Sequence, residues 1–159
     1  MHTRQDLSRK LALAGPVLAI AMLATSAAQA AGFGPRLGLT SEPDQVHVGM
    51  QLHLAQMAPS VSFVPSFEVG LGNDVRLFSA NMDIKHRFTS RAASWRPYLG
   101  GGPAIHFIDR DGAGDESDVG LNFFAGMQTP TRQGAFFGEI RVGLIDSPDF
   151  KFTVGWMFR

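Results

Sequence analysis

The chain has 159 residues, with 14 Lys/Arg against 14 Asp/Glu and no cysteine. This length is typical of a single domain, and without cysteine no disulfide can form. The balanced charge argues against nucleic acid as a partner, because proteins that bind nucleic acid carry an excess of positive charge.

The first thirty residues have the pattern of a secretory signal peptide. Basic residues stand near the start, an uncharged apolar run covers residues 11–24, and Ala28-Gln29-Ala30 is a small-x-small cleavage site. The apolar run is too short for a membrane-spanning helix, which needs about 20 residues. We therefore expect residues 1–30 to be removed on export. Residues 31–159 then form one domain with a slightly negative net charge.

Turn-forming residues divide this domain into eight segments. Groups rich in Pro, Gly, Asn, Asp and Ser stand at residues 41–44, 57–60, 72–74, 89–91, 109–116, 129–131 and 147–148. Such groups at short spacings are typical of consecutive β-hairpins. No segment shows a sustained helical period, so the sequence predicts an all-β domain.

The last segment shows most clearly how the side chains alternate. One face carries Phe150, Phe152, Val154, Trp156 and Phe158, and the other carries Lys151, Thr153, Gly155 and Met157. Successive side chains of a strand point to opposite faces, so this segment predicts a strand with one apolar face. The other seven segments repeat the pattern: one face is apolar, and the other mixes Gly, Ser, Asn, Gln, His and charged residues.

The direction of the apolar face decides between a soluble and a membrane barrel. Eight strands enclose room only for side chains, and the large apolar residues of all eight segments would overfill it. The reverse packing places the polar face in the lumen and the apolar face against lipid. The sequence therefore predicts an eight-stranded antiparallel up-and-down transmembrane β-barrel, which leaves no open edge. The predicted lumen network, a structural set of compensating charges, is Arg36, Glu68, Asp83, Lys85, Arg87, Glu139, Arg141 and Lys151.

The two ends of the predicted barrel differ in charge. Carboxylates gather at one end, most densely in an expected acidic outer loop of Asp109, Asp111, Asp115, Glu116 and Asp118. The other end holds arginines and an expected aromatic girdle of Phe33, Phe63, Phe88, Trp95, Phe136, Trp156 and Phe158. Outer-membrane barrels have short periplasmic turns and longer outer loops. We therefore expect the longest connection, in the acidic run, to lie outside the cell.

These features together resemble the small outer-membrane β-barrel family of OmpX and the OmpA membrane domain. Residues 98–104, Tyr-Leu-Gly-Gly-Gly-Pro-Ala, look like the Tyr-Leu-Gly-x-Gly strand frequent in that family. Val154, Trp156 and Phe158 resemble the C-terminal signal that the barrel-assembly machinery reads, although Arg159 follows here. The resemblance implies the outer membrane of a Gram-negative bacterium. It also implies contact with lipid and lipopolysaccharide, and we expect a monomer.

Residues of catalytic type occur, but no motif joins them into a site. They are His47, His53, His106, Ser62, Ser66, Glu68 and Asp83. A nucleophile needs a base within reach and a third group that orients this base. The acidic run at residues 109–118 lacks the spacing of a calcium loop, and divalent-bridged contact with lipopolysaccharide phosphates is a weaker hypothesis. We therefore predict no catalytic, cofactor-binding or metal site.

The leading prediction is a non-enzymatic integral outer-membrane protein with a plugged polar lumen and a role in envelope structure or surface interaction. Two alternatives stay open. One is a lipid A-modifying enzyme of the acylase or deacylase type, although the deacylase-type His-x-Ser pair is absent at His106. The other is a narrow channel for small solutes.

Overall fold

A computed structural model describes residues 32–41, 44–72, 75–89, 94–110 and 114–158. The strands in these residues are β1 (Gly32–Ser41), β2 (Gln45–His53), β3 (Ala55–Ala58), β4 (Val61–Leu71), β5 (Val75–Arg87), β6 (Arg96–Arg110), β7 (Gly114–Pro130), β8 (Gly134–Ile145) and β9 (Phe150–Phe158). Within this part of the chain, no helix is long and apolar enough to cross a membrane. The expected signal peptide, residues 1–30, lies outside the described residues.

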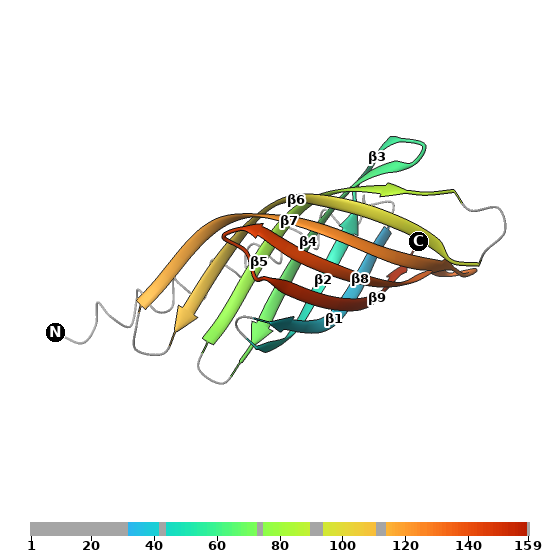
Figure 1. The fold of residues 1–159 in the computed structure, drawn as a ribbon. Coiled ribbons are helices and arrows are strands. Elements are labelled where there is room, and N and C mark those ends of the chain that lie inside the picture. The colour runs from blue at the N-terminus through green and yellow to red at the C-terminus, as the bar shows by residue number, and fades with distance from the viewer. Residues whose placement is uncertain (1–31, 42–43, 73–74, 90–93, 111–113, 159) are drawn as a thin grey trace, which may run out of the picture. The chain divides into compact units, whose positions relative to one another are not determined.

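The strands close into an antiparallel barrel (Figure 1). From β4 to β9 each strand pairs with the next along the chain, β1 pairs with β2, and β9 returns to pair with β1. The ring is completed by pairing between β2 and β4. Because β2 and β3 share one place in the wall, the barrel has eight strands. The predicted eight-stranded up-and-down barrel is confirmed.

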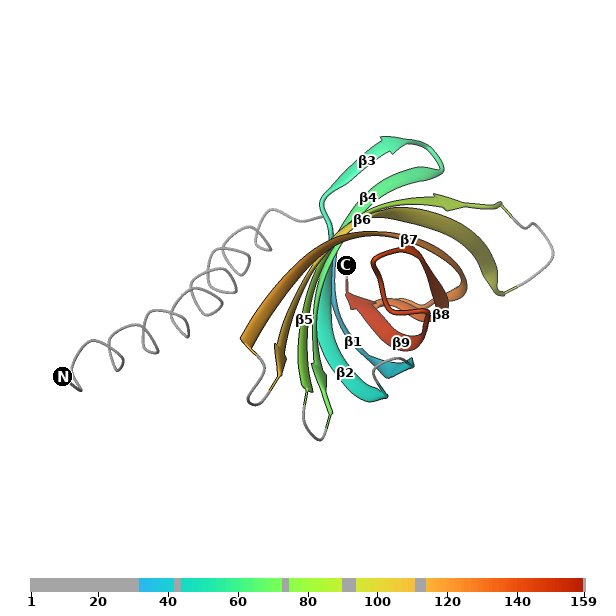
Figure 2. The ribbon, with the colours of Figure 1, turned by 60° about the vertical axis from the view of Figure 1, so that its left-hand side comes forward.

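The second predicted strand is interrupted by one extra residue. Gln51 pairs with Ser66 and Ala55 with Phe63, so four steps along one strand match three along the other. Such an insertion is a β-bulge, and it bends the strand. The described part of β1 begins at Gly32 and does not run alongside β3. Among the described strands, β3 therefore pairs only with β4. Figure 2 shows the β3–β4 hairpin extending away from the ring.

The acidic connection is shorter than predicted. β6 and β7 leave only residues 111–113 between them, and their ladder includes the pair Asp109 and Asp115. Backbone pairing between strands does not require apolar side chains, so the ladder continues into the polar run. The longest gap between strands is residues 88–95, at the opposite end. The prediction that residues 109–118 form the longest connection is therefore wrong.

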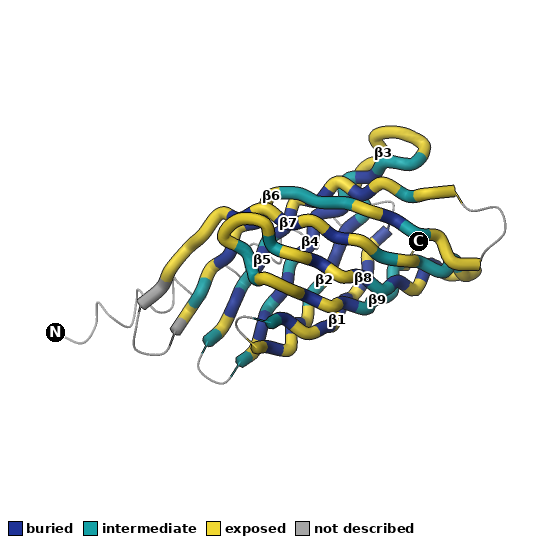
Figure 3. The backbone as a smooth tube through the Cα atoms, viewed as in Figure 1, coloured by how far each residue is buried: buried dark blue, intermediate teal, exposed yellow. Residues whose placement is uncertain are grey.

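The barrel wall has an apolar outer face and a mostly polar inner face. Figure 3 shows buried and exposed residues alternating along the strands. In β1 buried and exposed residues alternate strictly. The exposed side chains include large apolar ones such as Leu39 (60% exposed) and Val119 (69%). Among the buried residues, polar and charged ones outnumber apolar ones. The outward apolar face is therefore confirmed. Leu52 is an exception: it alternates with the exposed Val46, Val48 and Met50 along β2, yet it is buried, next to the bulge.

Candidate functional site: the barrel lumen

The centre of the lumen holds a buried arginine between two carboxylates. Arg141 on β8 contacts Asp83 on β5 with both terminal nitrogens, Nη1 to Oδ1 at 3.1 Å and Nη2 to Oδ2 at 2.6 Å. Its Nη2 also lies 3.1 Å from Glu139 Oε1. A charge removed from water is tolerated when it is paired and hydrogen-bonded, and this guanidinium is both.

The same ion pairing continues to the opposite wall. Arg36 on β1 lies 3.2 Å from Glu139 Oε1 and 3.0 Å from Glu68 Oε1 on β4. Lys151 on β9 donates to Glu68 Oε2 at 2.7 Å. All six side chains are buried. We call this series from Asp83 to Lys151 the ion-pair chain; it connects β5, β8, β1, β4 and β9.

Two predicted lumen cations lie outside the ion-pair chain. Lys85 is 6% exposed, and its Nζ lies 4.0 Å from the centre of the Tyr98 ring and 5.6 Å from that of Phe137. Among the described residues, no carboxylate lies within ion-pair distance of this ammonium group. Arg87 is half-buried, two residues nearer the end of β5. The structure thus brings six of the eight predicted residues together and places the other two at a separate point of the lumen.

Three aromatic side chains pack between the charges, each opposite a glycine. The cross-strand pairs are Tyr98 with Gly126, Phe124 with Gly100, and Phe137 with Gly155. In each pair the ring covers the glycine so closely that an added Cβ would clash with it. A ring that lies across a glycine of the next strand replaces the packing that the glycine lacks. Side-chain alternation puts these rings on the lumen face, but their pairing with glycines depends on strand register, which alternation alone does not determine.

The buried histidines are held by hydroxyl groups. His47 contacts Thr40 Oγ1 at 2.8 Å through Nδ1 and Thr153 Oγ1 at 3.0 Å through Nε2. His106 contacts Ser79 Oγ at 2.9 Å and Ser147 Oγ at 3.2 Å in the same way. In the part of the chain that the structure describes, neither ring is hydrogen-bonded to a carboxylate. Both nitrogens of each ring are therefore engaged by hydroxyl groups.

Within the described part of the chain, the remaining residues of catalytic type are not arranged as a nucleophile, a base and an orienting group either. Ser66 accepts a hydrogen bond from Asn81 at 3.2 Å. Asp83 and Glu68 belong to the ion-pair chain. His53 and Ser62 both line a cavity.

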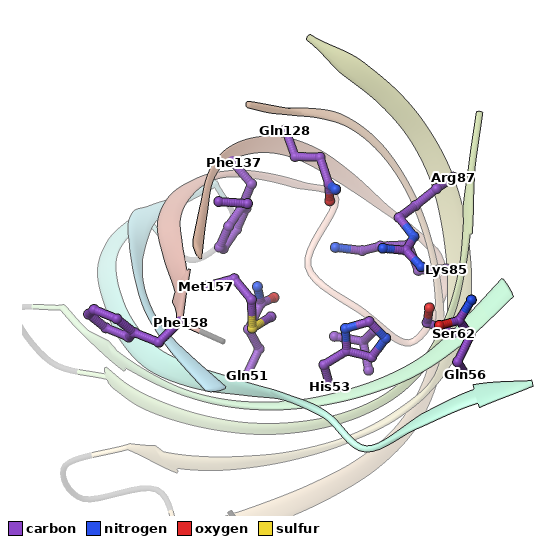
Figure 4. A pocket seen from close by; sticks show the side chains of 12 residues that line it. Gln51, His53, Gln56, Ser62, Lys85, Arg87, Gln128, Phe137, Met157 and Phe158 are labelled. Atoms are coloured by element: carbon purple, nitrogen blue, oxygen red, sulfur yellow. The ribbon is translucent and has the colours of Figure 1, made fainter. Parts of the chain in front are cut away.

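This cavity has a volume of about 340 Å³ and lies inside the barrel at the end where β5 finishes and β8 begins (Figure 4). Its buried lining includes Gln51, Ser62, Val64, Lys85, Ala135 and Phe137. Its less buried lining is His53, Gln56, Arg87, Gln128, Met157 and Phe158. Among these described residues none carries a carboxylate. The cavity thus has a buried floor, a partly exposed rim and a positive charge.

The predicted acidic residues lie on strands. Asp109 is exposed on β6, and Glu116 and Asp118 are exposed on β7. Asp115 is in β7, and Asp111 lies outside the described residues. Among the described residues no group of three or more His, Cys, Asp or Glu is arranged to hold a metal ion.

The C-terminal residues predicted as an assembly signal lie on β9. Val154 and Trp156 are half-buried, and Phe158 is exposed. Phe158 pairs with both Gly134 of β8 and Phe33 of β1, and its ring centre lies 5.2 Å from that of Phe33. These residues therefore form part of the strand that closes the barrel.

Comparison with known proteins relates this fold to small outer-membrane barrels. No family model and no curated protein sequence matches the chain. The structure of Neisserial surface protein A (NspA) matches 80% of this chain and 94% of its own, with a TM-score of 0.64 and 14% identity. The structure of the outer membrane enzyme PagL matches 81% of this chain and 99% of its own, with a TM-score of 0.50 and 11% identity. The structure of Ail of Yersinia pestis matches 79% of this chain and 91% of its own, with a TM-score of 0.36 and 15% identity. The first two show that the fold is that of a small outer-membrane β-barrel.

Proposed function

From this fold we propose that the chain is a non-enzymatic integral protein of a Gram-negative outer membrane, with a plugged lumen and a role in envelope structure or surface interaction. One observation carries the proposal: the outer face of a closed barrel exposes large apolar side chains while an ion-pair chain is buried inside. Exposed apolar surface of this extent is unfavourable in water and favourable against lipid tails. Closure also satisfies the backbone groups that a hydrocarbon medium would leave unpaired.

An aromatic belt at one end supports the membrane position. Its exposed members are Phe33, Phe88, Trp95, Phe136 and Phe158. They lie where β1, β6 and β8 begin and where β5 and β9 end, which is the same end of an antiparallel barrel. Aromatic side chains are enriched at the two interfaces of a transmembrane barrel. The belt therefore marks one boundary of the lipid-facing band.

We place the aromatic end on the periplasmic side and the acidic end outside the cell. The support is the position of the proposed assembly signal on β9 and the acidic character of Asp109, Glu116 and Asp118 at the opposite end. Loop length does not add support, because residues 88–95 at the aromatic end form the longest connection. On this orientation, residues 1–30 act as the signal peptide and the barrel-assembly machinery inserts the chain. Lipopolysaccharide surrounds the acidic end.

The plugged lumen argues against a channel. The ion-pair chain connects opposite walls, and the rings of Tyr98, Phe124 and Phe137 occupy the space beside it. We expect the full chain, reconstituted in planar bilayers, to show no steady conductance. A stable single-channel current would contradict this part of the proposal. Light scattering of the protein in detergent should give the mass of a monomer.

A lipid-modifying enzyme is the alternative that needs a direct test. PagL is described as an outer membrane enzyme and shares this fold. Here the buried histidines are engaged on both sides by hydroxyl groups inside the lumen, where a lipid acyl chain in the bilayer does not reach. We therefore expect the mass spectrum of lipid A to be the same with and without overexpression. A new species that lacks or gains an acyl chain would overturn the non-enzymatic part of the proposal while leaving the barrel itself intact.

A further inference from the structure

We propose that the lumen cavity binds a small amphipathic organic anion, with a carboxylate or phosphate group at Lys85 and an apolar body against Phe137 and Met157. The site lies inside the barrel and is independent of the apolar outer face on which the proposed function rests. Its volume of about 340 Å³ falls in the lower part of the range of small-molecule sites, about 300–1,000 Å³.

Lys85 supplies the charge that such a ligand would neutralise. The ion-pair chain contains three cations and three carboxylates, so it is balanced without this lysine. The Lys85 ammonium group instead lies over the Tyr98 and Phe137 rings. Burying a charge without a counter-ion is unfavourable, and cation–π contacts offset only part of this cost. An anion at Nζ would complete the pairing of the lumen charges.

Two buried polar groups on the floor also lack a partner. Gln51 Nε2 and Ser62 Oγ have no hydrogen-bond partner among the described residues, and these residues are 1% and 0% exposed. Gln51 Oε1 accepts a hydrogen bond from Arg36 Nη1 at 3.4 Å, which leaves the amide NH₂ group unused. Buried polar groups are normally hydrogen-bonded, so an amide and a hydroxyl left open in the same cavity as an ammonium group indicate a missing acceptor. An oxyanion is an acceptor for all three groups.

The apolar wall lies across from the cations. Figure 4 shows Lys85 and Arg87 entering the cavity from one side, with Phe137 and Met157 on the other. Phe137 is buried, and Met157 is half-buried toward the rim. A bare inorganic anion would leave this wall in contact with water. An anion with an aromatic ring or a short alkyl group would cover it and would gain from burying apolar surface.

The test uses the full barrel refolded in nonionic detergent and isothermal titration calorimetry. The probes are benzoate and phenyl phosphate. The controls are inorganic phosphate, which lacks the apolar group, benzyl alcohol, which lacks the charge, and benzylamine, whose charge is positive. We expect saturable binding of one or both aromatic anions, weaker binding of inorganic phosphate and no binding of benzylamine. Comparing benzoate with phenyl phosphate identifies the preferred oxyanion.

Variants locate the site. Lys85→Gln should weaken anion binding about tenfold or more, the loss expected for one charge-assisted hydrogen bond. The matched control Arg132→Gln removes an exposed cation from a turn at the same end of the barrel and should leave binding unchanged. If Lys85→Gln does not fold, Ser62→Ala removes only a hydroxyl group from the floor and should weaken binding while leaving the charge in place.

Chemical-shift changes in NMR spectra provide a second readout. We expect the anion to shift the amide signals of Gln51, Ser62 and Phe137 and to leave those of Asp109 and Glu116 unchanged. The proposal is overturned if no anion binds, if benzylamine binds as tightly as benzoate, or if the folded cavity variants bind like Arg132→Gln.

Discussion

Arg141 and Asp83 face each other across the lumen and share two parallel hydrogen bonds, 3.1 Å and 2.6 Å long. They come from β8 and β5, which are not neighbours in the wall. A bidentate guanidinium–carboxylate pair is selective for geometry as well as charge. This contact therefore fixes the relative position of two strands that share no backbone hydrogen bonds.

Removing one partner of this pair should be costly. We expect Asp83→Ala to lower the free energy of unfolding by about 3 kcal/mol, because among the described residues it leaves the buried guanidinium with only Glu139 and Asn81 as hydrogen-bond partners. Replacing both partners, in Asp83→Leu with Arg141→Met, should restore much of the loss. Urea unfolding in lipid vesicles, followed by tryptophan fluorescence, measures both. Asp149→Ala, at an exposed position, is the control, and equal stability of Asp83→Ala and this control would show that the pair is not structural.

The ring-over-glycine packing gives a second prediction. A Cβ at Gly126 would clash with the Tyr98 ring, whereas a Cβ at Gly138 would meet nothing within 4 Å. Gly126→Ala should therefore destabilise the barrel by about 1–3 kcal/mol, the usual cost of overpacking, while Gly138→Ala should be nearly neutral. The same unfolding measurement applies. Similar midpoints for the two variants would contradict the close packing of Tyr98 on Gly126.

A lysine on the outer face tests the lipid contact by depth. Met82 is 54% exposed near the middle of β5, and Leu71 is 55% exposed at the end of β4. A lysine costs about 2–4 kcal/mol at the bilayer midplane and about 0–1 kcal/mol near an interface. Met82→Lys should therefore destabilise the protein in vesicles far more than Leu71→Lys. If neither variant loses stability in vesicles, the apolar face is not in contact with lipid.

The proposed assembly signal can be tested within a single strand. Phe152 and Phe158 are both exposed outward on β9, but only Phe158 belongs to the predicted C-terminal signal. We expect Phe158→Ala to reduce the amount of folded protein in the outer membrane and Phe152→Ala to reduce it less. Fractionation of membranes with gel electrophoresis of unheated samples separates folded from unfolded chains. Equal losses would indicate a general packing effect rather than a signal.

How far the sequence predicts this fold depends on the property in question. The faces of each strand follow from the period of two, which explains why Arg36, Asp83 and Arg141 were correctly placed inward. Pairing across strands depends on register, which side-chain alternation alone does not determine. For that reason the sequence did not show that Tyr98 lies over Gly126 or that Lys85 is excluded from the ion-pair chain.

Local irregularities were harder to predict than the strands. The bulge before Ala55 depends on where β1 begins and on how β2 pairs with β4, and both are long-range properties. The polar composition of residues 109–118 predicts a loop. The ladder nevertheless continues through Asp109 and Asp115, since backbone pairing does not require apolar side chains.

The seam between the first and last strands has a kinetic consequence. Leu37 pairs with Val154 and Thr40 with Lys151, so the hydrogen bonds that complete the wall join residues more than a hundred positions apart. Such non-local contacts form slowly, because ordering a long loop precedes any gain from the contact. A nascent chain that still lacks β9 would expose two strand edges, whose unpaired backbone groups can pair with another chain. It therefore has to be protected from aggregation until β9 is available, because the barrel can close only when this strand pairs with β1.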